Sequence, residues 1–167
     1  MTRPSKDQYF LMMARIAAAR ATCAGRKVGC VLVDSGGHVL STGYNGVPAN
    51  VVHCCDTPCP GVTQETGIYS QCQAIHAEMN AVARCLRPHD VHTAYCTISP
   101  CTECVKILLA TTCRRLVYYE LHPASMPEAK QLWTTSGGAW LYETFYPEDL
   151  VEWVDATYKD DQVRKWQ

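Results

Sequence analysis

Two short motifs constrain the fold of this chain most, because their side chains have to meet in space. One motif is His76-Ala77-Glu78 and the other is Pro100-Cys101-Thr102-Glu103-Cys104. Two residues separate Cys101 from Cys104, so a single helical turn can present both thiolates to one tetrahedral Zn²⁺ ion, with His76 as the third ligand. Three protein ligands leave one position for water, which is the arrangement of catalytic rather than structural zinc sites.

Glu78 is not needed as a ligand, so we expect it to take a proton from water and to pass it on. The residues around the motifs favour this site. A buried strand is predicted at Ala94 to Ile98, and a helix at Cys101 to Ala110 follows it after Ser99-Pro100. Exposed N–H groups at a helix N-terminus favour thiolate over thiol. The histidine motif also lies near the start of a predicted helix, at about Ala74 to Arg87.

Each motif alone is weak evidence. A His-x-Glu triplet is common by chance, and a Cys-x-x-Cys pair can be half of a zinc ribbon or a redox pair. The combination, with proline before the first cysteine, is the signature of zinc-dependent nucleobase deaminases. The alternative from a different class is a non-catalytic binding module stabilised by zinc, which predicts a closed four-ligand site and no role for Glu78.

Length and composition predict one globular domain. The chain has 167 residues, of which 47% are hydrophobic and 19% charged. We expect a single domain over 1–167, with a core at about 5–145 and a helical tail at 146–167. A net charge of -1 argues against a generic nucleic-acid binder. The N-terminus lacks a signal-peptide pattern and no apolar run could span a membrane.

Cysteine content and hydrophobic pattern complete the outline. Eleven cysteines without an export signal predict a reducing compartment, the cytoplasm of a cell or of an infected host. The pattern predicts one mixed five-stranded sheet covered by helices on both faces, with the last two strands parallel. The remaining expected elements are helices at Ser5 to about Ala24, Met126 to Thr135 and from Pro147, and strands at Val28–Val33, His38–Tyr44, Arg115–Tyr119 and about Ala139–Tyr142.

From about Met12 to Tyr119 the chain resembles the cytidine deaminase superfamily, and more narrowly its deoxycytidylate (dCMP) deaminase branch. The resemblance implies the α/β/α sandwich of that superfamily and the hydrolytic deamination of dCMP to dUMP and ammonia. The stretches that carry it are Ala21-Thr22-Cys23, Arg26-Lys27-Val28-Gly29, Ser41-Thr42-Gly43-Tyr44-Asn45-Gly46, His53-Cys54-Cys55-Asp56, Ile75-His76-Ala77-Glu78-Met79-Asn80-Ala81 and Ile98-Ser99-Pro100-Cys101-Thr102-Glu103-Cys104.

The resemblance also assigns substrate contacts. It implies that the Ala77 N–H and the Ser99 carbonyl hold the edge of the base. Arg26 and Asn45 match family positions that contact phosphate and sugar, and Tyr118 is a further candidate. The structural alternatives are a solvated surface charge for Arg26 and a tyrosine packed in the sheet for Tyr118.

Regulation and assembly are implied by the same resemblance. Family members are typically homohexamers that dCTP with Mg²⁺ activates and dTTP inhibits. Gly43, Tyr44, Asn45 and Gly46 match part of the allosteric site, although a plain β-turn would also explain this segment. The rival activities are those of other zinc deaminases, acting on tRNA adenosine, guanine or cytidine.

A second metal site is predicted in the loop at 49–72. Related proteins hold a structural zinc in this region, and four thiolates would close a tetrahedral site and anchor a long loop. We expect Cys23, Cys54, Cys59 and Cys72 as ligands, with His53 or Cys55 as replacements. The alternative is a set of free thiols, because the spacing from Cys59 to Cys72 matches no fixed zinc template.

Overall fold

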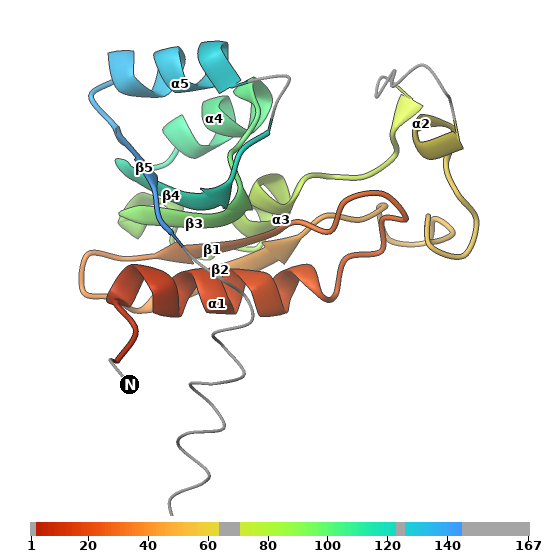
Figure 1. Cartoon of the computed structure of the whole chain (residues 1–167), viewed down its shortest axis with the longest axis horizontal. Coiled ribbons are helices and arrows are strands. Elements are labelled where there is room, and N and C mark those ends of the chain that lie inside the picture. Colours follow the sequence, from red (N-terminus) through yellow and green to blue (C-terminus); the bar gives the residue numbers. More distant parts are fainter. Residues whose placement is uncertain (1–2, 64–70, 123–125, 145–167) are drawn as a thin grey trace, which may run out of the picture.

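A five-stranded mixed sheet with helices on both faces forms the body of the protein (Figure 1). The computed structural model describes residues 3–63, 71–122 and 126–144. The helices are α1 (Lys6–Ala18), α2 (Pro60–Thr63), α3 (Ala77–Ala83), α4 (Thr102–Leu109) and α5 (Met126–Thr135), with a 3-10 turn at Pro88–Asp90. The strands are β1 (Gly29–Val33), β2 (Val39–Tyr44), β3 (Thr93–Ile98), β4 (Arg115–Glu120) and β5 (Ala139–Tyr142).

The strand order is β2-β1-β3-β4-β5. β1 pairs antiparallel with both β2 and β3, whereas β3, β4 and β5 run parallel. The strands expected at Val28–Val33 and His38–Tyr44 form an antiparallel pair, and the predicted parallel pair β4–β5 is confirmed. Because β3 and β4 are parallel, the loops after them leave the sheet at the same edge, where binding sites of open α/β sheets form.

Two apolar layers separate the sheet from its helices. α1 covers one face, where Phe10 and Leu11 pack against Val31 and Val117. α3, α4 and α5 cover the other face, where Leu108 and Trp133 belong to the apolar core. Central strands β1 and β3 are buried along their whole length, because both of their faces are covered. The predicted three-layer α/β/α sandwich is confirmed.

The first helix is shorter than predicted. Its expected end was near Ala24, but α1 ends at Ala18. The chain turns there because Thr22 has to reach two other segments, donating its N–H to the carbonyl of Asn45 and accepting from the N–H of Cys55. The periodic spacing of apolar residues gives no information about these long-range hydrogen bonds, so it could not predict where the helix ends.

The histidine helix is also shorter than predicted. α3 begins at Ala77, not near Ala74, because Ile75 is extended and forms an isolated β-bridge with Gly46. The helix ends at Ala83 rather than at Arg87. His76 is thus the N-cap residue, with an extended backbone, and not part of a helical turn.

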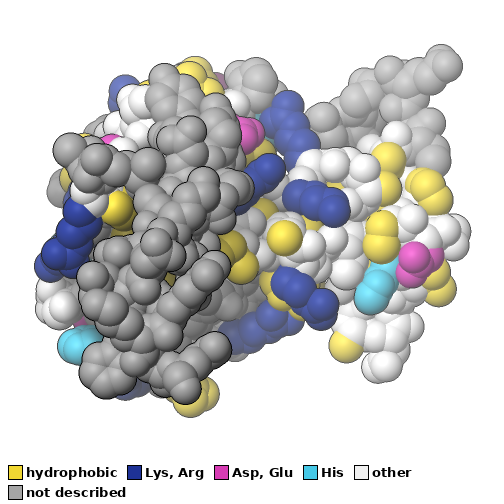
Figure 2. Space-filling model, turned by 60° about the horizontal axis from the view of Figure 1, so that its bottom comes forward, with side chains coloured by type: hydrophobic (Ala, Val, Ile, Leu, Met, Phe, Trp, Pro, Cys, Tyr) yellow, Lys and Arg dark blue, Asp and Glu magenta, His cyan; other side chains and the backbone are white. Residues whose placement is uncertain are grey.

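The long loop forms a lobe beside the body and contains the short helix α2 (Figure 1). Figure 2 shows Lys and Arg side chains on the surface between the body and this lobe. The helix expected from Pro147 lies outside the described residues. Within the described ranges, no helix has both the length and the apolar character needed to cross a membrane.

A polar cluster attaches α1 to the sheet. The Arg115 Nη1 donates to Asp7 Oδ1 at 2.8 Å, and the Tyr95 hydroxyl donates to the same oxygen at 2.9 Å. Burial acts to raise the pKa of Asp7, but the hydrogen bonds and charge of its partners outweigh it, so that the pKa lies below its ordinary value of 3.8.

We predict that Asp7→Ala lowers the free energy of unfolding by about 1–2 kcal/mol at neutral pH, because the partly buried Arg115 loses its carboxylate. Urea unfolding measures the change. The folded pKa of Asp7 lies below the unfolded one, so its contribution is complete above pH about 4 and is lost as the pH falls through the folded pKa. The control is Asp90→Ala in the exposed pair with Arg87, which should change stability by less than about 0.5 kcal/mol. Equal losses in both variants would contradict the prediction.

Candidate functional site

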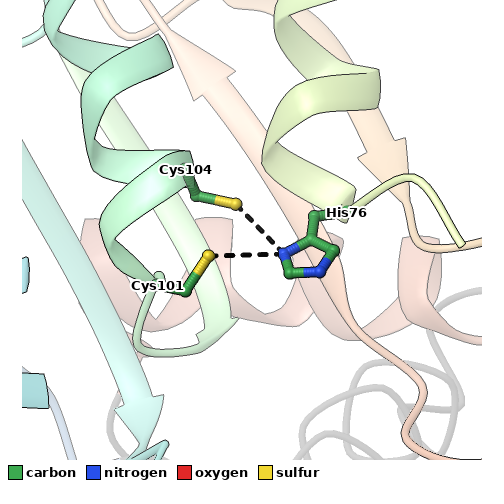
Figure 3. A group of neighbouring side chains, drawn as sticks. All are labelled: His76, Cys101 and Cys104. Carbon is green, nitrogen blue, oxygen red and sulfur yellow. Dashed lines mark hydrogen bonds between the residues drawn. The ribbon is translucent and has the colours of Figure 1, made fainter. Parts of the chain in front are cut away.

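The three predicted zinc ligands lie together at the edge of the sheet (Figure 3). His76 is the N-cap of α3, Cys101 is the N-cap of α4, and Cys104 lies in the first turn of α4. The His76 Nδ1 atom is 3.5 Å from the Cys101 Sγ and 3.3 Å from the Cys104 Sγ. Ligands of one tetrahedral zinc ion with normal bond lengths are about 3.5 Å apart. The donor set and its spacing therefore fit Zn²⁺.

The three ligands differ in exposure. Cys104 is buried, Cys101 is partly buried and His76 is exposed. A hydrogen bond from Cys104 lowers the pKa of the Cys101 thiol to about 3, and the same contact raises the pKa of Cys104. The hydrogen bond with Cys101 raises the pKa of His76. One thiol is thus already ionised at neutral pH, which suits metal binding.

Glu78 lies beneath this group in the first turn of α3. Its side chain is only 3% exposed, and its Oε2 accepts a hydrogen bond from the Cys104 thiol at 3.3 Å. Burial raises the pKa of Glu78. A carboxyl group whose pKa is raised toward neutrality can both accept and release a proton at physiological pH, so the placement suits a general acid–base.

A cavity of about 340 Å³ opens above these residues, large enough for a small organic ligand. Its wall combines side chains of the sheet edge with residues of the lobe. The predicted site residues in its lining are Cys23, Arg26, Asn45, Cys72, His76, Ala77, Glu78, Ser99 and Cys101.

The two groups expected at the base edge both line this cavity. Ala77 is the first residue of α3, where a backbone N–H has no partner within the helix. Ser99 follows β3 and donates its N–H to the carbonyl of Glu120 at 2.8 Å. The first residue of a helix and a strand-end residue therefore both border the cavity.

Asn45 lines the cavity, and its side-chain amide also positions the neighbouring backbone. Its Oδ1 accepts from the N–H of Val28 at 2.8 Å, and its Nδ2 donates to the carbonyl of Arg26 at 2.8 Å. The amide is 8% exposed. Asn45 therefore holds the segment that carries Arg26, an exposed residue that contributes to the cavity wall.

Glycines of the Gly-Tyr-Asn-Gly segment are explained by packing. A Cβ at Gly43 would lie 2.1 Å from the carbonyl oxygen of Ala77, so β2 can approach α3 this closely only with glycine. A Cβ at Gly46 would lie 2.4 Å from the Thr22 Oγ1. Tyr44 stacks under Arg84, whose guanidinium carbon is 5.5 Å from the ring centroid.

Tyr118 is not among the residues described in the cavity wall. It is buried in the apolar core that α5 covers, and its ring packs against Trp140 and Tyr142 of the neighbouring strand β5. Its hydroxyl accepts from the Trp140 indole N–H at 3.0 Å. The structure thus matches the packing alternative for Tyr118, because alternation along β4 directs it into the core.

Cys23 and the three loop cysteines expected at a second metal lie near enough to influence one another, but among the described residues they do not form a group of three or more ligand atoms within 4.8 Å of one another. Cys23, Cys54 and Cys59 are buried, and Cys54 Sγ accepts from the Cys59 N–H at 3.3 Å. Burial raises the pKa of Cys23, and the nearby thiols of Cys54, Cys72 and Cys59 raise it further. The proposed replacements, His53 and Cys55, instead form an exposed group with Asp56.

His122 lines the cavity but was missed by the motif analysis. It lies two residues after β4 and donates its backbone N–H to the Ser99 Oγ at 2.8 Å. The sequence signal that could have identified His122 is its position just after a predicted strand, because side chains after parallel strands gather at one edge of the sheet.

Comparisons with known proteins agree with this site. The family model described as the cytidine and deoxycytidylate deaminase zinc-binding region matches residues 4–120. A deoxycytidylate deaminase of Mycobacterium phage D29 is 39% identical over 125 residues, covering 71% of this chain and 97% of the relative. One of Schizosaccharomyces pombe is 36% identical over 159 residues, covering 89% of this chain but 47% of the relative. The chain therefore spans about half of the yeast protein.

Solved structures share the fold. The dCMP deaminase of cyanophage S-TIM5, in complex with dCMP and dUMP, aligns with a TM-score of 0.65 and 21% identity over 86% of this chain and 99% of that chain. Its apo form gives a TM-score of 0.64.

We predict that Asn45→Ala lowers the free energy of unfolding by about 1–3 kcal/mol, because the backbone groups at Val28 and Arg26 lose their partners. Chemical denaturation followed by circular dichroism measures the loss. Gln131→Ala on the exposed face of α5 is the control and should stay within about 0.5 kcal/mol of wild type. Unchanged stability of the Asn45 variant would show that these bonds do not hold the segment.

Proposed function

Because the chain belongs to the cytidine and deoxycytidylate deaminase family, we propose that it catalyses the zinc-dependent hydrolysis of dCMP to dUMP and ammonia. The observation that carries the proposal is the placement of buried Glu78 against a His/Cys/Cys metal-ligand set in one cavity. A closed structural zinc site would need no buried carboxylate beside it, so this placement favours an enzyme over a binding module.

His76, Cys101 and Cys104 would hold the zinc ion, which when bound supplies water activated for attack at neutral pH. Glu78 takes the proton of the attacking water as C4 of the cytosine is attacked. It delivers that proton to N3. It then carries the second proton of the former water, from the oxygen now bonded to C4, to the amino group, so that the C4–N bond breaks and ammonia leaves. The Ala77 N–H and the Ser99 carbonyl would orient the base, and the apolar cavity wall limits competing water.

A monophosphate is the substrate class that fits the cavity wall best. Arg26 supplies a permanent cation in the wall, and Asn45 holds the segment that carries it. Guanidinium groups bind phosphate through paired, charge-assisted hydrogen bonds. An assay across dCMP, cytidine, dCTP and adenosine substrates separates this proposal from the other zinc deaminase activities, since only a dCMP deaminase prefers the monophosphate.

We further propose regulation by nucleotides, with dCTP and Mg²⁺ as activators and dTTP as inhibitor. The support is family resemblance at Gly43, Tyr44, Asn45 and Gly46, although packing alone accounts for both glycines. The same resemblance supports a homohexamer. Action in the cytoplasm of a cell or a phage-infected host is proposed from the eleven free cysteines.

A structural zinc bound by Cys23, Cys54, Cys59 and Cys72 is the second metal we propose. The support is that three of these side chains are buried and that their thiols influence one another. The burial of Cys54 and Cys59 in the long loop, away from the main core, is explained if a metal replaces the missing apolar contacts.

We predict that Glu78→Gln abolishes turnover, by at least about 100-fold in kcat, while the zinc content stays unchanged, because glutamine cannot carry the proton. Loss of cytosine absorbance measures turnover, and atomic emission measures zinc. The matched control is Glu103→Gln, which removes an exposed carboxylate within the cysteine motif that pairs with Lys106. Near-normal turnover in the Glu78 variant would refute the proton-carrier role.

We also predict two zinc ions per wild-type chain. Cys54→Ser should remove one of them and His76→Ala the other, since the two ligand sets are separate. Cys55→Ser should keep both, because Cys55 lies in the exposed group. One zinc ion per chain in fully active protein would rule out the structural site.

A further inference from the structure

The edge strand β5 leaves apolar surface open on the face of the sheet that carries α1. Cross-strand partners share a face, and Leu141 is the partner of Val117, which packs in the layer under α1. α1 packs mainly against β1 and β3, and Leu141 is 36% exposed. On the opposite face, Trp140 packs against the core that α5 covers. Among the described residues, an open strip of sheet therefore lies beside α1.

The outer side of α1 also exposes apolar side chains. Tyr9 is 46% exposed and Ile16 is 61% exposed, with the partly buried Met13 between them. Spacings of four and three residues place these side chains in one stripe along the helix. A helix whose outer side meets only water usually carries polar residues there. We call this stripe, together with Leu141, the α1–β5 surface.

The chain leaves β5 next to α1. The Gln8 Nε2 donates to the carbonyl of Thr144 at 3.4 Å, two residues after the end of β5. Residues 145–167 follow and lie outside the described residues. Because Thr144 is held at α1, this segment starts at the α1–β5 surface and needs no linker to reach it.

The sequence of the segment predicts an amphipathic helix. Pro147 is suited to the first turn of a helix. Apolar residues follow at helical spacing and form one stripe, consisting of Leu150, Val151, Val154 and Tyr158. Within 147–158 the charged side chains are all acidic, namely Glu148, Asp149, Glu152 and Asp155. The predicted helix thus has an apolar stripe bordered by negative charge.

α1 presents the opposite charge. Arg15 lies in its last turn and Arg20 lies just beyond its end, and both are exposed. No carboxylate within the described ranges forms an ion pair with either of them. An apolar stripe with arginines near one end is complementary to an apolar stripe bordered by carboxylates.

Helix geometry indicates in which direction the segment runs. Both helices rise by about 1.5 Å per residue, so a helix that follows α1 from the Gln8–Thr144 contact keeps the 136-residue offset of that contact. Glu152 and Asp155 are then level with residues 16–19, at the end of α1 that carries the two arginines. The reverse direction would carry the segment past the start of α1, away from these charges.

We propose that the C-terminal segment of this chain, with a helix at 147–158, docks on the α1–β5 surface of the same molecule. Its apolar stripe would cover Ile16 and Leu141, and its carboxylates would lie beside Arg15 and Arg20. The segment would complete the layer of helices on this face of the sheet. This inference does not depend on the deaminase activity.

Hydrogen exchange of the full-length protein, followed by mass spectrometry, tests the docking. In wild type, amides within 148–158 should exchange at least about tenfold more slowly than in an unstructured chain. Ile16→Asp should remove this protection, because it places an unpaired charge in the apolar contact. Val154→Asp should do the same from the segment itself, without altering the body of the protein.

The control is Val52→Asp on the lobe, where the side chain is 65% exposed, and it should leave the exchange of 148–158 unchanged. A charge-reversal pair tests the predicted direction. Arg20→Glu should speed the exchange by about threefold, since like charges then meet, and adding Asp155→Arg should restore it.

Three results would overturn the proposal. One is wild-type exchange at the rate of an unstructured chain, and another is unchanged protection in Ile16→Asp. The third is protection that disappears on dilution together with a fall in the mass measured by sedimentation, because a second copy of the chain would then hold the segment.

Discussion

The meeting of one imidazole and two thiolates at the sheet edge is the contact on which the rest of the site depends. His76 and Cys101 are both N-cap residues with an extended backbone, and neither side chain caps its own helix. The two helices pack on the same face of the sheet. This packing fixes the helix starts, and the three ligand atoms come within coordination distance of one metal ion.

Packing and chemistry share residues in this protein. Gly43 allows β2 to lie against the backbone of α3, and this close contact sets the position of the helix that carries Glu78. Asn45 uses its amide to hold the backbone on either side of Lys27. A motif that resembles a ligand-binding segment therefore also has a structural purpose. The burial of Glu78 likewise serves both packing and chemistry, because the packing that excludes water from the carboxyl group also raises its pKa.

The cavity is a composite of the body and the lobe. Residues of the sheet edge supply the His/Cys/Cys group and the buried Glu78, whereas Gly61, Val62 and Cys72 of the loop close the other side. The loop therefore matters to the site even though it contains no residue of the catalytic motifs. Its residues Cys54 and Cys59 are buried within a segment that has little regular structure, which connects the stability of the lobe to the shape of the cavity.

Sequence alone predicted the strands and the residues that cluster at the candidate site. Apolar runs identified all five strands, and the motif spacing identified His76, Glu78, Cys101 and Cys104, because ligand number and helical geometry are local properties. Tertiary structure decided the rest. It ended α1 at Ala18 and delayed α3 to Ala77, directed Tyr118 into the core, and brought His122 to the cavity. The physical reason is that each of these outcomes depends on hydrogen bonds and packing between segments distant in the chain, which local periodicity does not contain.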